Sequence, residues 1–64
     1  MKELLTFELR PGMLAHRIDG AFKDRLRLIV SVVEEPGHVV LCYLDVGGLH
    51  RGRRYPDHHL WFVM

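Results

Sequence analysis

The sequence contains one cysteine, one serine and no long hydrophobic run, and each shortage excludes a class of structure or chemistry. With Cys42 alone, the chain cannot form an internal disulfide, which fits a reducing compartment. With Ser31 alone and no Gly-x-Ser-x-Gly motif, the sequence does not indicate a serine hydrolase. The longest apolar run extends from Val39 to Leu44, whereas a membrane-spanning helix needs about 20 apolar residues. We therefore expect no membrane partner.

The chain is short and almost neutral. Its 64 residues suffice for one domain, spanning 1–64, and such a domain buries only about 60% of the surface that the unfolded chain exposes. Apolar residues make up 48% of the sequence, which is typical of a globular protein. Because the net charge is +1, overall charge does not indicate nucleic acid or membrane binding. The thin core leaves room for a partner protein to add stability.

The segment from Leu26 to Leu44 predicts a central β-hairpin. It is rich in β-branched residues, and Glu35-Pro36-Gly37 supplies the turn, since Pro fixes φ and Gly accepts positive φ. In the first strand we place Leu28, Val30 and Val32 on the core side. In the second strand, Val39 to Leu44 is apolar on both faces. This predicts cover on both sides, by the chain itself or by another subunit.

The flanking segments predict further short strands. Residues 1–10 form an N-terminal strand or arm, in which Leu5, Phe7 and Leu9 alternate with polar residues; a short amphipathic helix over Lys2 to Phe7 is the alternative. Pro11-Gly12 then turns the chain. The remaining expected elements are a strand over Met13 to Ile18, a strand over Leu49 to Tyr55 with a bulge at Gly52, a 3-10 turn over Pro56 to His59, and a last strand over Leu60 to Met64.

The order of these signals resembles the small SH3-like β-barrel proteins that are common in tailed-phage genomes. The matching motifs cover most of the chain: Pro11-Gly12-Met13-Leu14, Arg25 to Val30, Val39 to Tyr43 followed by Asp45-Val46-Gly47-Gly48, and Asp57 followed by Leu60 to Val63. The resemblance implies an all-β fold, a small SH3-like barrel of five to six short antiparallel strands with a 3-10 turn before the last strand. The Ala-Leu-Tyr-Asp-Tyr run of peptide-binding SH3 domains is missing, so polyproline recognition is not expected.

Candidate metal and catalytic residues do not form a recognisable set. His58 and His59 are adjacent, and adjacent residues of an extended strand point to opposite faces, so they would not share a zinc ion. Cys42 lies in mid-strand among apolar neighbours, which favours a structural thiol over a nucleophile. We therefore expect no catalytic residue, no metal and no cofactor.

The segment from His50 to Tyr55 has the composition of a binding surface. It holds Arg51, Arg53, Arg54 and Tyr55, and arginine beside an aromatic ring suits phosphate contacts and base stacking. The same arginines would also pair with carboxylates of an acidic protein surface. A solvated strand face, whose charges protect a sheet edge from aggregation, is the structural alternative.

Trp61 and Phe62 complete the expected partner-binding set. Because they are adjacent in a strand, one ring should lie inside and the other outside. Aromatic and arginine side chains are enriched at protein interfaces. The expected partner-binding residues are Leu5, Phe7, Arg51, Arg53, Arg54, Tyr55, Trp61 and Phe62.

These observations favour a non-enzymatic protein–protein assembly module, which the resemblance places in a tailed-phage virion as a small structural or accessory protein. Its partners would be other subunits in a homo- or hetero-oligomeric assembly, and its location the virion or the cytoplasm. A nucleic-acid-binding barrel and a small inhibitor of a host protein are the two alternatives that the same residues allow.

Overall fold

The computed structural model describes residues 2–18, 20, 23–57 and 60–64, and it confirms the all-β prediction. Six strands and one short 3-10 turn are present in this part of the chain. The elements are β1 (Lys2–Leu5), the 3-10 turn η1 (Thr6–Glu8), β2 (Leu14–Arg17), β3 (Arg27–Glu35), β4 (His38–Asp45), β5 (Gly48–Arg54) and β6 (Leu60–Val63).

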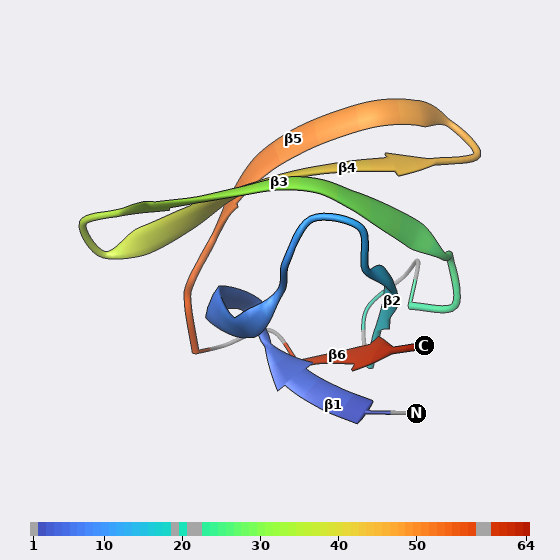
Figure 1. Cartoon of the computed structure of the whole chain (residues 1–64), viewed down its shortest axis with the longest axis horizontal. Coiled ribbons are helices and arrows are strands. Elements are labelled where there is room, and N and C mark those ends of the chain that lie inside the picture. The colour runs from blue at the N-terminus through green and yellow to red at the C-terminus, as the bar shows by residue number, and fades with distance from the viewer. Residues whose placement is uncertain (1, 19, 21–22, 58–59) are drawn as a thin grey trace.

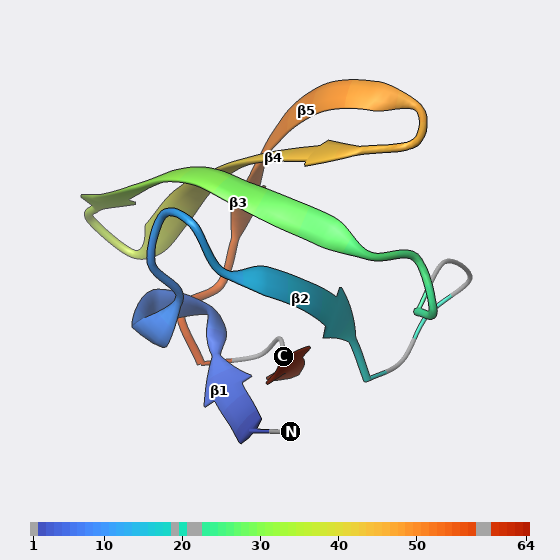
Figure 2. The same cartoon turned by 45° about the vertical axis from the view of Figure 1, so that its right-hand side comes forward.

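The six strands form one antiparallel sheet in the order β1-β6-β2-β3-β4-β5. The sheet bends sharply, so that β3, β4 and β5 form one layer and β1, β6 and β2 form a second layer below it (Figures 1 and 2). The predicted closed barrel is wrong, because β1 and β5 remain the two edges of an open sheet. After Leu5 the chain enters η1, and one backbone bond, from Phe7 N–H to the Pro56 carbonyl at 3.3 Å, links η1 to the segment that follows β5.

The 3-10 turn lies at the opposite end of the chain from its predicted place. It covers Thr6–Glu8, where the Glu8 carboxylate accepts a hydrogen bond from the Leu5 N–H at 2.9 Å. This local bond stops the N-terminal strand after four residues, so the expected Leu5-Phe7-Leu9 row does not form. Pro56 and Asp57 form an ordinary turn, and His58 and His59, part of the predicted 3-10 segment, lie outside the described residues.

The central hairpin is present as predicted, but its first strand contains a bulge. Ile29 pairs with Tyr43 and Ser31 pairs with Cys42, so Val30 is an extra residue on β3. The bulge shifts the alternation of β3 by one residue, so that Ile29 before it and Val32 after it both face the core, whereas Val30 is 45% exposed. The prediction that Leu28 and Val30 face the core is therefore wrong, whereas Val32, beyond the bulge, packs against the core. At Gly52, where a bulge was expected, the register of β4 and β5 is unbroken.

The core lies between the two layers and is centred on Trp61. The buried residues of this cluster are Leu4, Leu9, Ala15, Ile29, Leu41, Trp61 and Val63. The indole N–H of Trp61 donates to the Thr6 hydroxyl at 2.9 Å, and both side chains are fully buried. Arg27 is also buried, with its guanidinium 5.5 Å from the Trp61 ring and 5.3 Å from the Tyr43 ring. Cation–π contact on two rings lets a charged side chain enter this core.

The positions of Ile29 in the core and of Val30 at the surface can be tested with two neighbouring substitutions. Ile29→Asp should prevent folding, because burying an unpaired carboxylate costs several kcal/mol, comparable with the ~5 kcal/mol that stabilises a small domain. Val30→Asp should fold and lose only about 1 kcal/mol, since its side chain reaches solvent. Urea unfolding followed by circular dichroism measures both. Equal losses of stability would show that Val30 is buried in the core as deeply as Ile29.

The Thr6–Trp61 bond predicts a second stability effect. Thr6→Val keeps the shape of the side chain but leaves the buried indole N–H without its acceptor, at a cost of about 1–3 kcal/mol of unfolding free energy. Thr6→Ser retains the hydroxyl and is the matched control, with a smaller loss. Urea unfolding monitored by tryptophan fluorescence distinguishes the two. If valine were as stable as serine at this position, the hydrogen bond would contribute nothing.

Candidate functional site

The face of β3, β4 and β5 that points away from the core carries a set of exposed apolar side chains. We call this surface the outer face. Its exposed large apolar members are Leu28, Val30, Val33, Leu44 and Leu49. Val40 and Cys42 lie between them, buried and half-buried respectively. The expectation that both faces of Val39–Leu44 are covered is thus fully met on the inner side only, where Val39 and Leu41 are buried; on the outer face the cover ends before Leu44, which is exposed.

The strand register arranges the outer face in rows. Leu28, Leu44 and Leu49 are consecutive partners across three strands and form an apolar row at one end. In the middle, Ser31 and Cys42 lead to Arg51, and at the other end Val33 and Val40 lead to Arg53. Cross-strand partners are about 5 Å apart, so the rows make one continuous surface. It is apolar in the centre and positively charged along β5.

The predicted basic segment is therefore divided between two faces. Arg51 and Arg53 are exposed on the outer face, whereas Arg54 pairs with Val39 and lies on the inner side. Tyr55, directly after β5, is exposed. The arginines share a strand, but only Arg53, Arg54 and Tyr55 line the same hollow.

This hollow, which we call the basic groove, has a volume of about 640 Å³. Two of its lining side chains, Arg17 from β2 and His38 from β4, were not among the predicted partner-binding residues. The Pro36-Gly37 turn of the central hairpin supplies the remaining wall, with Gly37 at a φ of 78°. No sequence spacing indicates this set, since it depends on the pairing of Val39 with Arg54 and on the approach of Arg17 from β2.

The other predicted partner-binding residues are dispersed. Leu5 is half-buried in β1, and Phe7 is exposed in η1, where it lines a small hollow with Pro56. Trp61 is fully buried and stabilises the core. Phe62 lies on the opposite side of β6, half-buried, with its ring 5.2 Å from that of His16. The aromatic pair therefore does not present a ring on the outer face.

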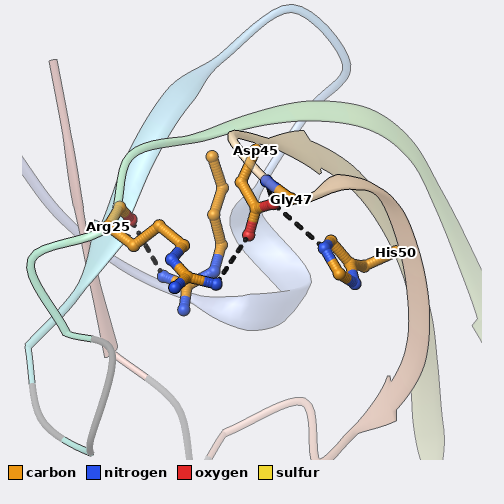
Figure 3. A network of polar contacts seen from close by, with 5 residues as sticks. Arg25, Asp45, Gly47 and His50 are labelled. Atoms are coloured by element: carbon orange, nitrogen blue, oxygen red, sulfur yellow. Dashed lines mark hydrogen bonds and ion pairs between the residues drawn. The ribbon is translucent and has the colours of Figure 1, made fainter.

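A polar network joins the β4–β5 turn to the segment before β3 (Figure 3). The Asp45 carboxylate accepts hydrogen bonds from the Gly47 N–H at 2.7 Å and from His50 Nε2 at 2.9 Å, and it lies 3.6 Å from the Arg25 guanidinium. The side chain of Asp45 is only 2% exposed. Burial acts to raise the pKa of Asp45, but the bonds from Gly47 and His50 and the nearby Arg25 charge outweigh it and hold this pKa below its ordinary value.

This network was not among the predicted sites, and it is structural. An Asp two residues before a Gly is a signal for a side-chain-closed turn, which is what Asp45 and Gly47 form. His50 also stacks on Tyr43 at 5.4 Å, so this end of the hairpin is held by charge and by ring contacts. Its rigidity fixes the start of β5 and hence the position of the arginines.

Metal binding finds no support in the described part of the chain. Within residues 2–18, 20, 23–57 and 60–64, no three His, Cys, Asp or Glu side chains gather as a metal-binding group. His16 contacts Phe62, His50 is bonded to Asp45, and Cys42 lies on the outer face, so these candidates occupy separate places. Among the same residues no helix is long and apolar enough to cross a bilayer.

The Asp45 network predicts a pH-dependent stability. Since the folded-state pKa of Asp45 lies below 3.8, its value without these contacts, the ionised carboxylate stabilises the fold at higher pH, and this stabilisation disappears as the pH falls below 3.8 through the folded-state pKa. Asp45→Asn should therefore be less stable than the parent at about pH 7, and the difference should shrink towards about pH 2. Urea unfolding over this pH series measures the difference. A constant difference would mean that the charge of Asp45 does not matter.

Similarity to known proteins supplies no assignment for these surfaces. Comparison with protein-family models, with curated proteins and with solved structures finds no match to this chain. The resemblance to small SH3-like phage proteins therefore rests on the sequence motifs alone. Evidence for function therefore comes from the geometry of the outer face and of the basic groove.

Proposed function

We propose that the chain is a non-enzymatic assembly module that docks onto another protein subunit through its outer face. The observation that carries this proposal is the exposure of five large apolar side chains on one side of β3, β4 and β5, opposite a core that is already complete. Folding buries Ile29, Leu41 and Trp61, and it leaves the outer face in water. A partner surface would remove this apolar area from water at about 25 cal/mol per Å².

The distribution of charge on the outer face fits a protein interface. Apolar side chains lie in its centre, and Arg51 and Arg53 lie along β5 at its border. Interfaces between proteins are commonly apolar at the centre, with a polar rim and enrichment in arginine. The partner surface would therefore be apolar at its centre and acidic where it meets the two arginines.

The edge of the sheet adds a second means of contact. β5 pairs with β4 on one side only, and within the described residues no strand covers its other side. The backbone N–H and C=O groups of such an edge can pair with a strand from another chain. A partner strand added at β5 would meet Leu49, Arg51 and Arg53 directly, since all three are exposed on this edge strand.

The place of this module in a tailed-phage virion is part of the proposal. It is supported by the resemblance of the Pro11-Gly12, Asp45-Val46-Gly47-Gly48 and Leu60-to-Val63 motifs, while the outer face supports docking to a protein of any source. An inhibitor of a host protein would use the same surface. The identity of the protein that co-purifies with the chain separates a virion subunit from a host enzyme.

Two matched substitutions test the docking surface. Val33→Asp puts a charge on the outer face, and Val46→Asp puts the same charge in the β4–β5 turn; Val33 is 50% exposed and Val46 is 93% exposed, so both variants should fold. Native mass spectrometry of the parent should show an oligomer or a complex with a second protein. We expect Val33→Asp to weaken the binding free energy of this oligomer or complex by about 2 kcal/mol or more, and Val46→Asp to leave it unchanged.

Two results would contradict the proposal. The first is a parent chain that remains a free monomer in its native source, because the outer face would then stay uncovered. The second is a complex that Val33→Asp and Val46→Asp affect equally, since this would separate assembly from the outer face. Circular dichroism of each variant confirms that the sheet is retained before the comparison is made.

A further inference from the structure

We propose a second binding site, which shares only Arg53 with the outer face: the basic groove binds a phosphate-bearing ring compound, a nucleotide that is either free or part of a single strand. The groove brings together Arg17, His38, Arg53, Arg54 and Tyr55 around about 640 Å³. Small-molecule sites commonly measure about 300–1,000 Å³, and they combine a few convergent polar groups with apolar walls. The basic groove matches these sites in volume, and its lining is more polar than theirs, since four of its seven described lining residues are Arg or His.

The charge of the groove selects an anion. Three of the lining residues are arginines, and none of the described residues that line it carries a carboxylate. His38 is bonded to a carboxylate, that of Glu35, which lies 2.6 Å from its Nε2. Arg53 and Arg54 alone bring two guanidinium charges against this one carboxylate, so their side of the groove keeps an excess of positive charge at neutral pH. Arginine also matches phosphate geometrically, because its fork can donate two parallel hydrogen bonds.

Arg54 is held in place by the backbone of its own strand. Its Nη1 donates to the Arg53 carbonyl at 2.9 Å, and its guanidinium folds back over Gly52. A Cβ added at Gly52 would approach Arg54 Nη1 to 2.7 Å, so the glycine leaves the space that this guanidinium occupies. The arrangement restricts the side chain before any ligand binds, which lowers the entropy that binding would cost.

The exposed ring of Tyr55 selects a ligand with a planar face. Tyr55 follows Arg54 directly and lines the same groove. Stacking of a base on an aromatic ring stabilises the complex and requires a base that is not already stacked in a duplex. Phosphate on the arginines and a base on Tyr55 together describe a nucleotide unit. An acidic peptide would satisfy the arginines but not the ring.

The experiment uses the full chain and four probes: AMP, a fluorescein-labelled oligothymidylate of about ten nucleotides, inorganic phosphate and polyglutamate. Fluorescence anisotropy gives the affinity for the oligonucleotide, and calorimetry gives that for AMP and phosphate. Arg54→Ala should weaken binding of oligothymidylate or AMP about tenfold or more, since it removes a charge-assisted contact. Arg51→Ala is the matched control, because it removes the same charge from the same strand on the opposite face.

Two further variants, Gly52→Ala and Val33→Asp, supplement the Arg51→Ala control. At about 0.1 M salt, where exposed charges beyond about 10 Å are largely screened, Arg51→Ala should change affinity by less than about twofold. Gly52→Ala keeps every charge and displaces only the end of the Arg54 side chain, so weaker binding by this variant identifies the position of Arg54 as the cause. Val33→Asp, which tests the outer face, should leave nucleotide binding unchanged, so the two proposals fail separately.

The source of the nucleotide follows from the first two probes. Equal affinity per site for AMP and oligothymidylate identifies a free nucleotide, and much tighter binding of oligothymidylate identifies a single strand. Three results would overturn the proposal: no binding of either probe, equal losses with Arg51→Ala and Arg54→Ala, or competition by polyglutamate as strong as that by unlabelled oligothymidylate. The last result would assign the groove to an acidic protein.

Discussion

The bulge at Val30 determines which apolar side chains form the core and which form the outer face. Before it, β3 directs Ile29 inward beside Arg27; after it, Val32 packs against the same core. Strict alternation starting from Ile29 would direct Val32 outward and Val33 inward, and the extra residue returns Val32 to the core. The bulge therefore keeps a long, strongly bent hairpin in contact with Trp61, and it leaves Val30 and Val33 outside. The interior and the proposed docking surface thus have one common cause.

The sequence predicted the local features of this fold more successfully than the tertiary ones. The turns at Pro11-Gly12 and Pro36-Gly37 follow from proline and positive-φ glycine, and both glycines have positive φ in the structure. The bulge was missed because β3 is apolar on both faces, so alternation cannot identify the inner set. Closure was predicted wrongly because it depends on whether β1 can reach β5, and the Leu5–Glu8 hydrogen bond ends β1 first.

The candidate sites show the same limit. Composition pointed to Arg51, Arg53, Arg54 and Tyr55, and strand periodicity alone places Arg53 and Arg54 on opposite faces. The remaining members of the basic groove, Arg17 and His38, come from β2 and β4, and only the folded sheet brings them near β5. A strand with arginines on both faces can therefore contribute to two surfaces, one apolar with a charged border and the other hollow and basic.

The two edges of the open sheet differ in length, and this difference limits how copies or partners can add to it. β5 offers seven residues and β1 only four. Adding strands from one molecule to the next through both edges would produce a fibre without a defined end. A short edge that holds a partner weakly stops such growth, while the long edge still accepts one strand. The asymmetry favours complexes of fixed size over indefinite polymers, although the sheet formed by the described residues stays open.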